Sequence, residues 1–256
     1  MTSSPSETTA IIIGAGRGAR LMPLTEDTPK CYAEIQGKSI LDWIQEAFRE
    51  AGIERIVFIG GYQIERIRSD YPEFIYYQNS DWENNNILLS LFYAQAEMAR
   101  PFVCSYADIL FKGSVVKRAI ETQHDITIVA DTDWRSRYTG RTQHPEDDAE
   151  KIRADGETVN LIHRDIPSEE ADGEYIGVTH FSAEGARQLK EHFHRARAEH
   201  DRGPYREAGS FQKAYLIHLY QDMIEHGVPF HKVDTHGDYM EIDTTEDYHL
   251  AEREWR

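Results

Sequence analysis

Residues Ala10–Lys30 read AIIIGAGRGARLMPLTEDTPK and join an apolar run to a glycine-rich segment. The part from Gly14 to Ala19 fits the G-x-G-x-x-G/A pattern of a dinucleotide-binding turn. Such a turn leads directly into a helix, whose N-terminus holds the pyrophosphate. Here Pro23 and Pro29 follow the glycines, and proline interrupts a helix. The stretch therefore predicts a strand and a long glycine loop without a crossover helix, which disfavours a Rossmann cofactor site.

The composition favours a globular chain that binds small molecules. With 256 residues the chain can bury a full core. Its formal net charge of −17 disfavours nucleic acid or an anionic membrane as a partner, because both attract basic surfaces. Cys31 and Cys104 lack metal-ligand spacing, which fits a reducing compartment such as the cytoplasm. Residues 1–8 are small and polar, so we expect a flexible tail followed by one domain over residues 9–256.

Short apolar runs alternate with amphipathic segments as far as residue 130. We expect strands at Ala10–Ile13, Arg55–Ile59, Phe74–Tyr77, Phe102–Ser105 and Ile126–Ala130, and helices at Ile40–Ala51, Gln63–Ser69, Asn86–Ala99 and Ser114–Thr122. This alternation is typical of an α/β fold, with a mostly parallel central sheet flanked by helices.

The second half changes character. We expect a hairpin from Lys151–Arg153 and Glu157–His163, strands at Tyr175–Phe181, Phe230–Asp234 and Tyr239–Ile242, and helices at Ala183–Glu199, Gly209–Gly227 and Glu246–Trp255. The last two strands are expected to finish the sheet.

The glycine loop is locally positive on an acidic protein. Glycine lets backbone N–H groups approach phosphate oxygens closely. Arg17 and Arg20 add guanidinium donors, and Lys30, after Pro29, adds a compact positive charge. A solvated turn with scattered charges is the alternative. We favour a nucleotide-phosphate site that includes Gly14, Ala15, Gly16, Arg17 and Gly18.

The stretch GAGRGARLMPLTEDTPK, followed by Gly37–Leu41, resembles the signature of the nucleotidyltransferases that activate sugar phosphates and phosphocholine. Those enzymes carry a glycine loop, an arginine, a proline, a threonine and a Pro-Lys pair in this order. The resemblance implies a nucleotide-diphospho-sugar transferase-like (GT-A-like) single domain and an enzyme of the EC 2.7.7 type. It also implies a nucleotide-binding half over about residues 9–130 and an acceptor-binding half over about residues 131–256.

Further segments carry the same resemblance. Gly61-Tyr62 resembles the family's base-contacting turn, and Tyr106-Ala107-Asp108 resembles the end of its metal-aspartate strand. Met240–Thr244 resembles the closing metal segment of the phosphocholine cytidylyltransferase branch. Asn86 and Ser90 also resemble that branch more than the hexose-1-phosphate branch. The implied nucleotide contacts therefore include Gly61, Tyr62, Asn86, Ser90 and Ala107.

Asp108 and Asp243 are the expected metal ligands. Mg²⁺ prefers carboxylate oxygens, and one ion would bridge the α-phosphate of the nucleotide and the acceptor phosphate. Lys30 and Arg20 would act catalytically, by stabilising negative charge on the α-phosphoryl oxygens and on departing pyrophosphate. No protein base is required, because an acceptor phosphate or phosphonate is already ionised near neutral pH. Capping of a helix or turn is the alternative role for each aspartate.

Two patterns suggest how the acceptor binds. Arg135, Arg137 and Arg141 follow a predicted strand and would receive the acceptor's phosphate or carboxylate, although a solvated loop fits the pattern equally well. Lys151 resembles the family's second lysine, which contacts the acceptor phosphate. These cations favour an acceptor with extra negative charge, such as a phosphonate or a carboxylated phosphate.

The other pattern is an aromatic cage with nearby carboxylates, which a quaternary ammonium would require. Glu174, Tyr175, Phe211 and Tyr215 could supply it, and we also expect Glu241 in the acceptor pocket.

Together these observations predict a Mg²⁺-dependent cytidylyltransferase. It would transfer CMP from CTP to a small phosphorylated or phosphonylated acceptor, such as a phosphonate or a phosphocholine-like molecule, and release pyrophosphate. One alternative is a hexose-1-phosphate nucleotidyltransferase that uses dTTP, UTP or GTP. Another is a non-catalytic nucleotide-sensing subunit, which the joint presence of Lys30, Asp108 and Asp243 disfavours. The expected partners are these small molecules, without nucleic acid or membrane, and a homo-oligomer is compatible with the sequence.

Overall fold

A computed structural model describes residues 4–22, 25–201 and 203–256. The main strands are β1 (Thr9–Gly14), β4 (Arg55–Gly60), β5 (Ile75–Gln78), β6 (Phe102–Tyr106), β8 (Ile126–Asp131), β9 (Lys151–Asp155), β10 (Thr158–Ile162), β11 (Gly173–Phe181) and β12 (Phe230–Thr235). They form one nine-stranded sheet in the order β5-β4-β1-β6-β11-β8-β12-β10-β9. β1 pairs parallel with β4 and β6, whereas β11 runs antiparallel to β6 and β8. The predicted α/β fold is confirmed, with a central sheet that mixes parallel and antiparallel pairs.

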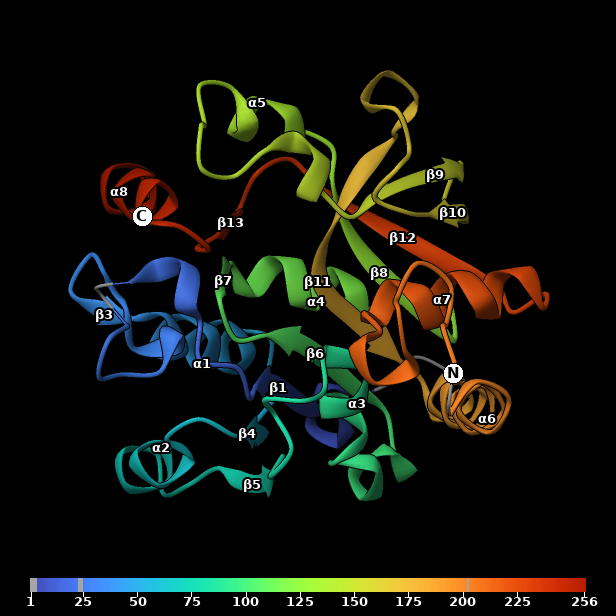
Figure 1. Cartoon of the computed structure of the whole chain (residues 1–256), viewed down its shortest axis with the longest axis horizontal. Coiled ribbons are helices and arrows are strands. Elements are labelled where there is room, and N and C mark those ends of the chain that lie inside the picture. The colour runs from blue at the N-terminus through green and yellow to red at the C-terminus, as the bar shows by residue number, and fades with distance from the viewer. Residues whose placement is uncertain (1–3, 23–24, 202) are drawn as a thin grey trace.

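Helices cover both faces of this sheet (Figure 1). They are α1 (Ile40–Glu50), α2 (Ile64–Asp70), α3 (Ile87–Phe92), α4 (Gly113–Ile120), α5 (Trp134–Tyr138), α6 (Ala183–His200), α7 (Leu216–Glu225) and α8 (Thr245–Glu254). Successive residues of a strand point to opposite faces, so Ala10 and Ile12 pack into one buried cluster with α1 and α4. Ile11 and Ile13 pack into the other cluster with α3, α6 and α7. Cover on both faces explains why β1, β6 and β8 are almost continuously apolar.

A second, two-stranded sheet positions the candidate site. It consists of β7 (Ile109–Phe111) and β13 (Tyr239–Glu241), which pair antiparallel. The prediction that this last strand finishes the main sheet is therefore wrong. β7 begins immediately after Asp108, and β13 pairs with it so that the backbone N–H of Ile242 donates to the carbonyl of Asp108 (3.0 Å). The pairing brings Asp243 next to Asp108, although the two residues lie far apart in the sequence.

Two predicted helices are shorter in the structure. In place of one helix over residues 86–99, α3 ends early and a separate 3-10 helix follows. In place of a helix over residues 209–227, α7 begins at Leu216. The segment before α7 is held in a non-α form, because the carbonyl of Ala214 accepts a hydrogen bond from the backbone N–H of Leu88 (3.3 Å). The other predicted helices and strands are present, with ends that differ slightly.

The segment predicted as a flexible tail, residues 1–8, is described only in part. Residues 1–3 lie outside the described residues, whereas Pro5–Glu7 form a 3-10 helix and Thr8 is buried. In the part of the chain that the structure describes, none of the helices is both long enough and apolar enough to cross a lipid bilayer.

Candidate active site

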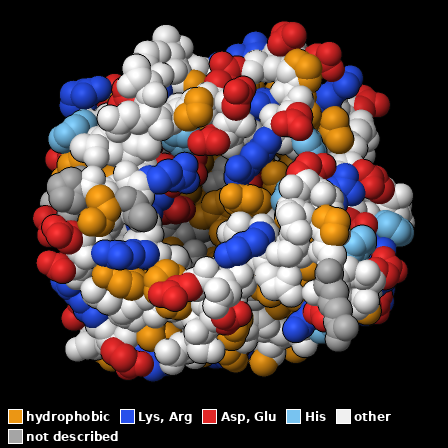
Figure 2. Space-filling view, in the orientation of Figure 1, with side chains coloured by type: hydrophobic (Ala, Val, Ile, Leu, Met, Phe, Trp, Pro, Cys, Tyr) orange, Lys and Arg blue, Asp and Glu red, His pale blue; other side chains and the backbone are white. Residues whose placement is uncertain are grey.

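A cavity of about 530 Å³ opens at the sheet edge where β1 and β6 end. Figure 2 shows the hollow near the centre of one face, with hydrophobic side chains on its floor and Lys or Arg side chains around it. We divide its lining into three groups. The glycine region comprises Gly14, Ala15, Gly16 and Gly18; the charged centre comprises Arg20, Lys30, Asp108, Glu241 and Asp243; and the glutamate region comprises Glu150, Arg164, Glu174 and Tyr215.

The glycine loop follows β1 without a crossover helix, as predicted. After Gly18 the described residues form only a 3-10 turn, at Ala19–Leu21, and Pro23 lies outside the described residues. Gly18 has a φ of +73°, and a β-carbon there would lie 2.6 Å from Cβ of Lys30. Glycine at this position therefore lets the stem of Lys30 pack directly against the loop.

Other predicted nucleotide contacts also line the cavity. Asn86, Ser90 and Ala107 belong to the lining. Asn86 begins α3, because its side chain accepts a hydrogen bond from the backbone N–H of Ile87 (2.8 Å). The hydroxyl of Ser90 accepts one from the buried amide of Asn79 (2.9 Å). These contacts fix this part of the cavity wall without a ligand.

Three predicted nucleotide contacts are absent from this lining: Arg17, Gly61 and Tyr62. The backbone N–H of Tyr62 donates to the carbonyl of Ala15 (3.0 Å), so the turn supports the glycine loop. The Tyr62 ring packs edge to face on Trp82, which does line the cavity, with a centroid distance of 5.7 Å. The guanidinium of Arg17 lies 5.5 Å from the centre of the Tyr62 ring. The structure therefore assigns these residues a supporting position.

Lys30 holds the charged centre together. Its buried ammonium donates to Asp108 Oδ2 (2.8 Å) and to Asp243 Oδ1, and Arg20 also pairs with Asp243. Burial alone would lower the pKa of Lys30, but the two carboxylates outweigh it and raise the pKa. Burial would likewise raise the pKa of Asp243, yet Lys30 and Arg20 hold it below its usual range. The predicted lysine and both predicted aspartates thus meet at one point.

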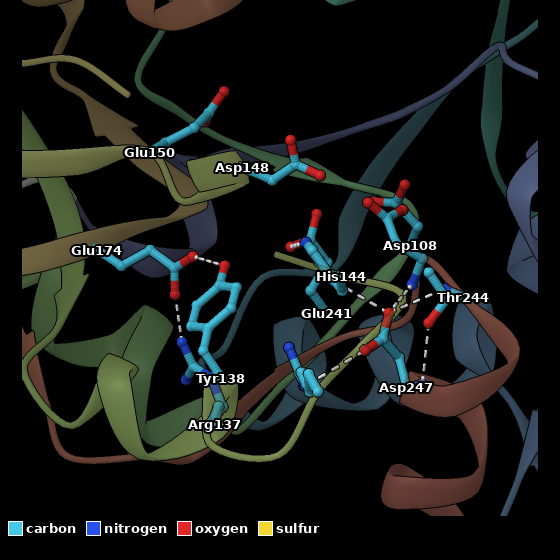
Figure 3. Close-up of polar contacts among 12 residues, drawn as sticks. Asp108, Arg137, Tyr138, His144, Asp148, Glu150, Glu174, Glu241, Thr244 and Asp247 are labelled. Atoms are coloured by element: carbon cyan, nitrogen blue, oxygen red, sulfur yellow. Dashed lines mark hydrogen bonds and ion pairs between the residues drawn. The ribbon is translucent and has the colours of Figure 1, made fainter. Parts of the chain in front are cut away.

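The charged centre has the donor set for a divalent cation. His144, Glu241 and Asp243 each offer a ligand atom, and these atoms lie within 4.8 Å of one another. Burial and the neighbouring carboxylates of Asp243 and Asp108 raise the pKa of Glu241 well above its usual range. The ring of His144 is fixed from behind, because its Nδ1 lies 3.1 Å from Asp247 Oδ2 (Figure 3). Carboxylate oxygens gathered in this way are ligands that a divalent cation takes in proteins.

The glutamate region is held in place by side chains of the protein. Tyr106 donates to Glu150 Oε2 (3.0 Å), and Arg164 donates to Glu150 Oε1 (3.2 Å). Burial raises the pKa of Glu150, against the opposing effects of Arg164 and Tyr106. Glu174 is buried and accepts hydrogen bonds from Tyr138 (2.6 Å) and from Arg137 (Figure 3). Both carboxylates therefore have fixed positions.

The arginines and the lysine predicted to bind the acceptor are absent from the cavity lining. Arg137 points inward and pairs with both Asp131 and Glu174. Arg141 is buried 3.4 Å from a carboxylate oxygen of Asp247. Lys151 is also buried, whereas Arg135 is exposed. The charges of Arg137 and Arg141 are matched by buried acids, two of which come from distant segments, so the local sequence resembled an anion site.

The predicted aromatic cage does not form. Tyr175 lines the cavity, but its hydroxyl is hydrogen-bonded to Thr179 (2.7 Å), and Phe211 is absent from the lining. The Tyr215 ring carries the guanidinium of Arg164 at 4.3 Å from its centre. Of the other predicted acceptor residues, Glu174 and Glu241 do line the cavity.

Sequence reasoning missed Glu150, Arg164 and His144, all of which line the cavity. The signal for the first two is weak: they flank the predicted hairpin on its two sides, and each stands next to other charged residues. His144 lies in an irregular segment rich in acids, and only the position of Asp247 reveals its orientation.

The chain matches the MobA-like NTP transferase domain over residues 10–200, and it therefore belongs to this family of nucleotidyltransferases. One relative is a CTP:phosphoglutamine cytidylyltransferase from Campylobacter jejuni subsp. jejuni serotype O:2, which is 29% identical over 248 residues, 93% of this chain and 96% of the relative. Another is a 2-aminoethylphosphonate cytidylyltransferase from Lancefieldella rimae, 28% identical over 77% of this chain and 76% of the relative. The chain is an enzyme of the nucleotidyltransferase class.

Solved structures share the fold over nearly the full length. The CTP:phosphocholine cytidylyltransferase of Streptococcus pneumoniae superposes with a TM-score of 0.73 at 22% identity, over 98% of this chain and 100% of that chain. The inositol-1-phosphate CTP transferase of T. maritima superposes with a TM-score of 0.75 at 21% identity, over 97% and 96%. These matches agree with the predicted GT-A-like architecture.

Proposed function

We propose that the chain is a Mg²⁺-dependent cytidylyltransferase, which transfers CMP from CTP to a small acceptor carrying a phosphate or a phosphonate. The observation that carries the proposal is the position of Lys30, which packs against Gly18 and pairs with Asp108 and Asp243. The choice of CTP is supported by the two relatives that extend over most of the chain, since both are named as cytidylyltransferases.

The proposed reaction is a single displacement at phosphorus. An oxygen of the acceptor phosphate attacks the α-phosphorus of CTP, the bond from that phosphorus to the bridging β-phosphate oxygen breaks, and pyrophosphate leaves. Backbone N–H groups of the glycine region hold the phosphates, while Lys30 and Arg20 stabilise negative charge on the transferred phosphoryl group and on pyrophosphate. The acceptor oxygen is already ionised near neutral pH, so the protein does not have to remove a proton.

A divalent cation fits the residues present. Asp108 and Asp243, which Lys30 joins, would hold it, and Glu241 and His144 offer further ligand atoms beside Asp243. When bound, the ion supplies positive charge that reduces the repulsion between two anionic substrates. Lys30 keeps Asp108 and Asp243 in position, and Asp247 keeps His144 turned toward Glu241.

A pyrophosphate-release assay tests the proposal. Purified protein is incubated with each common NTP against phosphocholine, 2-aminoethylphosphonate, phosphorylated amino acids and hexose 1-phosphates. We expect release with CTP and a non-sugar acceptor, dependent on Mg²⁺. Release with a hexose 1-phosphate and UTP, dTTP or GTP would support the sugar-phosphate alternative. NTP binding without release from any pair would support the sensing subunit.

Asp108→Asn tests the metal assignment in the same assay. The side chain is partly exposed, with 32% accessible, so the variant is expected to fold. We expect the Mg²⁺-dependent release to be lost while the thermal unfolding midpoint changes little. Asp165→Asn is the matched control, because that carboxylate is 88% exposed and lies outside the cavity lining. Near-normal turnover of Asp108→Asn would contradict the assignment.

A further inference from the structure

The glutamate region lies apart from the charged centre. Figure 3 shows Glu150 and Glu174 on one side of the view and Asp108 on the other. Both glutamates and Arg164 belong to the lining of the same cavity as Asp108. An acceptor whose phosphate reacts at the charged centre would therefore present its remote end to the glutamate region.

The negative charge around the two glutamates exceeds the positive charge of the arginines that pair with them. Glu174 shares Arg137 with the buried carboxylate of Asp131, so one guanidinium serves two acids. Among the residues that the structure describes, Glu150 has only Arg164 as a cationic partner, and burial still raises its pKa. The two carboxylates are close enough for Glu174 to raise the pKa of Glu150 further. An ammonium group near both would relieve this repulsion and donate hydrogen bonds to the carboxylate oxygens.

Arg164 has an unpaired donor at the same place. Its Nη2 donates to Glu150, but its Nε is buried and has no hydrogen-bond partner among the described residues. A buried donor without a partner is costly, and a guanidinium presents parallel N–H groups that match a carboxylate. The guanidinium carbon lies 4.3 Å from the centre of the Tyr215 ring, and this contact holds the guanidinium at the cavity.

The same contact disfavours a trimethylammonium group. A quaternary ammonium binds to the faces of aromatic rings and offers no N–H donor. One face of Tyr215 is occupied by Arg164, and Phe211 is absent from the lining. Glu150 and Glu174 instead suit a primary ammonium, which can donate several hydrogen bonds.

We infer that the remote end of the acceptor is an α-amino acid head group, with its ammonium bound between Glu150 and Glu174 and its carboxylate bound by Arg164. This inference rests on the proposed function, since it concerns the acceptor of the same cavity. The inference assigns acceptor selectivity to Glu150 and Arg164, which flank the β9–β10 hairpin, and to Glu174 on β11. It does not assign selectivity to the arginines of α5.

Matched acceptors test the carboxylate contact. O-phospho-L-serine and phosphoethanolamine differ only in the α-carboxylate, and so do O-phospho-L-homoserine and 3-aminopropyl phosphate. With CTP and Mg²⁺, we expect kcat/KM for the amino acid in the better pair to exceed that of its partner by at least about 10-fold, as for a lost charge-assisted hydrogen bond. Phosphocholine is expected to be poorer than either member. Equal or better use of phosphocholine or of the decarboxylated partners would overturn the inference.

The variant Arg164→Gln tests whether the preference for the carboxylate comes from Arg164. The amino-acid to amine ratio of kcat/KM is expected to fall to about 1, because both acceptors then lack the guanidinium. The ratio is measured within one protein, so a partial loss of folded enzyme cancels. Arg153→Gln is the control, since this exposed arginine of the same hairpin pairs with Glu170 and should leave the ratio unchanged. An unchanged ratio in Arg164→Gln would overturn the assignment.

Equilibrium binding separates this inference from the proposed function. Isothermal titration of O-phospho-L-serine and phosphoethanolamine into wild type and Arg164→Gln requires no turnover. Carboxylate-dependent binding that is lost in the variant would support the head-group site even if no NTP released pyrophosphate. Pyrophosphate release without any preference for the carboxylate, in rate or in binding, would overturn the head-group site and leave the cytidylyltransferase proposal standing.

Discussion

The glycine region and the glutamate region line one cavity but are built differently. The glycine region comes from one short segment, residues 14–18, and offers mainly backbone to a ligand. The glutamate region combines side chains from distant parts of the chain, and its acids are already paired with Tyr106, Tyr138, Arg137 and Arg164. A motif of the first kind can be recognised in the sequence, whereas the second exists only once the sheet has formed.

Arg137→Ala should give the largest effect and tests whether the glutamate region is held by the protein itself. The variant leaves Asp131 and Glu174 buried without their shared cation, so the free energy of unfolding should fall by about 3–5 kcal/mol. Arg135→Ala is the matched control on the same short helix, where the exposed side chain should change stability by less than about 0.5 kcal/mol. Urea unfolding at pH 7 measures both.

A variant of normal stability but weaker acceptor binding would support a direct role of Arg137 in binding the acceptor. If Arg137→Ala kept wild-type stability and raised only the KM for the acceptor, Arg137 would be a substrate contact, as the sequence suggested.

Lys30→Ala tests whether the charged centre acts in the chemical step. Removing a preorganised charge that meets the transferred phosphoryl group should lower kcat by about 100- to 1,000-fold, with a much smaller change in KM for CTP. Lys117→Ala is the control, because this lysine is 62% exposed on α4. Steady-state pyrophosphate release gives both constants. A large rise in KM with kcat intact would make Lys30 a binding residue only.

His180→Leu should give the smallest effect on the free energy of unfolding. It tests whether the loss of stability at low pH comes from a buried group of the central sheet or from the carboxylates of the cavity. His180 lies on β11, the strand that also carries Glu174, and neither ring nitrogen has a hydrogen-bond partner among the described residues. Burial lowers the pKa of His180 to about 4. The unfolded chain binds this proton below a pH of about 6.5, so stability is lost as the pH falls from there toward 4.

At pH 5 this loss amounts to about 2 kcal/mol relative to pH 7. In His180→Leu the difference in unfolding free energy between pH 7 and pH 5 should shrink by that amount, whatever the absolute stability of the variant. His249→Leu, at an exposed position, is the control and should retain the wild-type difference. An unchanged difference in His180→Leu would place the acid sensitivity elsewhere, for instance in the cavity.

The sequence was most informative where structure is set locally. Apolar runs predicted the strands, and the prolines after Gly18 predicted the loop without a crossover helix. Lys30, Asp108 and Asp243 could be found because each stands in a recognisable motif at a strand end or after the glycine loop. What the sequence could not show is that Lys30 contacts both aspartates.

The arginines predicted to bind the acceptor lie outside the cavity lining for a physical reason. The charges of Arg137 and Arg141 are cancelled by Asp131, Glu174 and Asp247, and two of these acids come from distant segments. A local count of charge cannot reveal such pairing. For the same reason Glu150 and Arg164 looked like ordinary hairpin charges until β9, β10 and β11 placed them along the cavity.

The pairing of β7 with β13 makes the charged centre depend on a contact between distant segments. Asp108 directly precedes β7 and Asp243 follows β13, and the backbone N–H of Ile242 donates to the carbonyl of Asp108. A substitution that loosens this two-stranded sheet would therefore separate the two carboxylates without changing either of them.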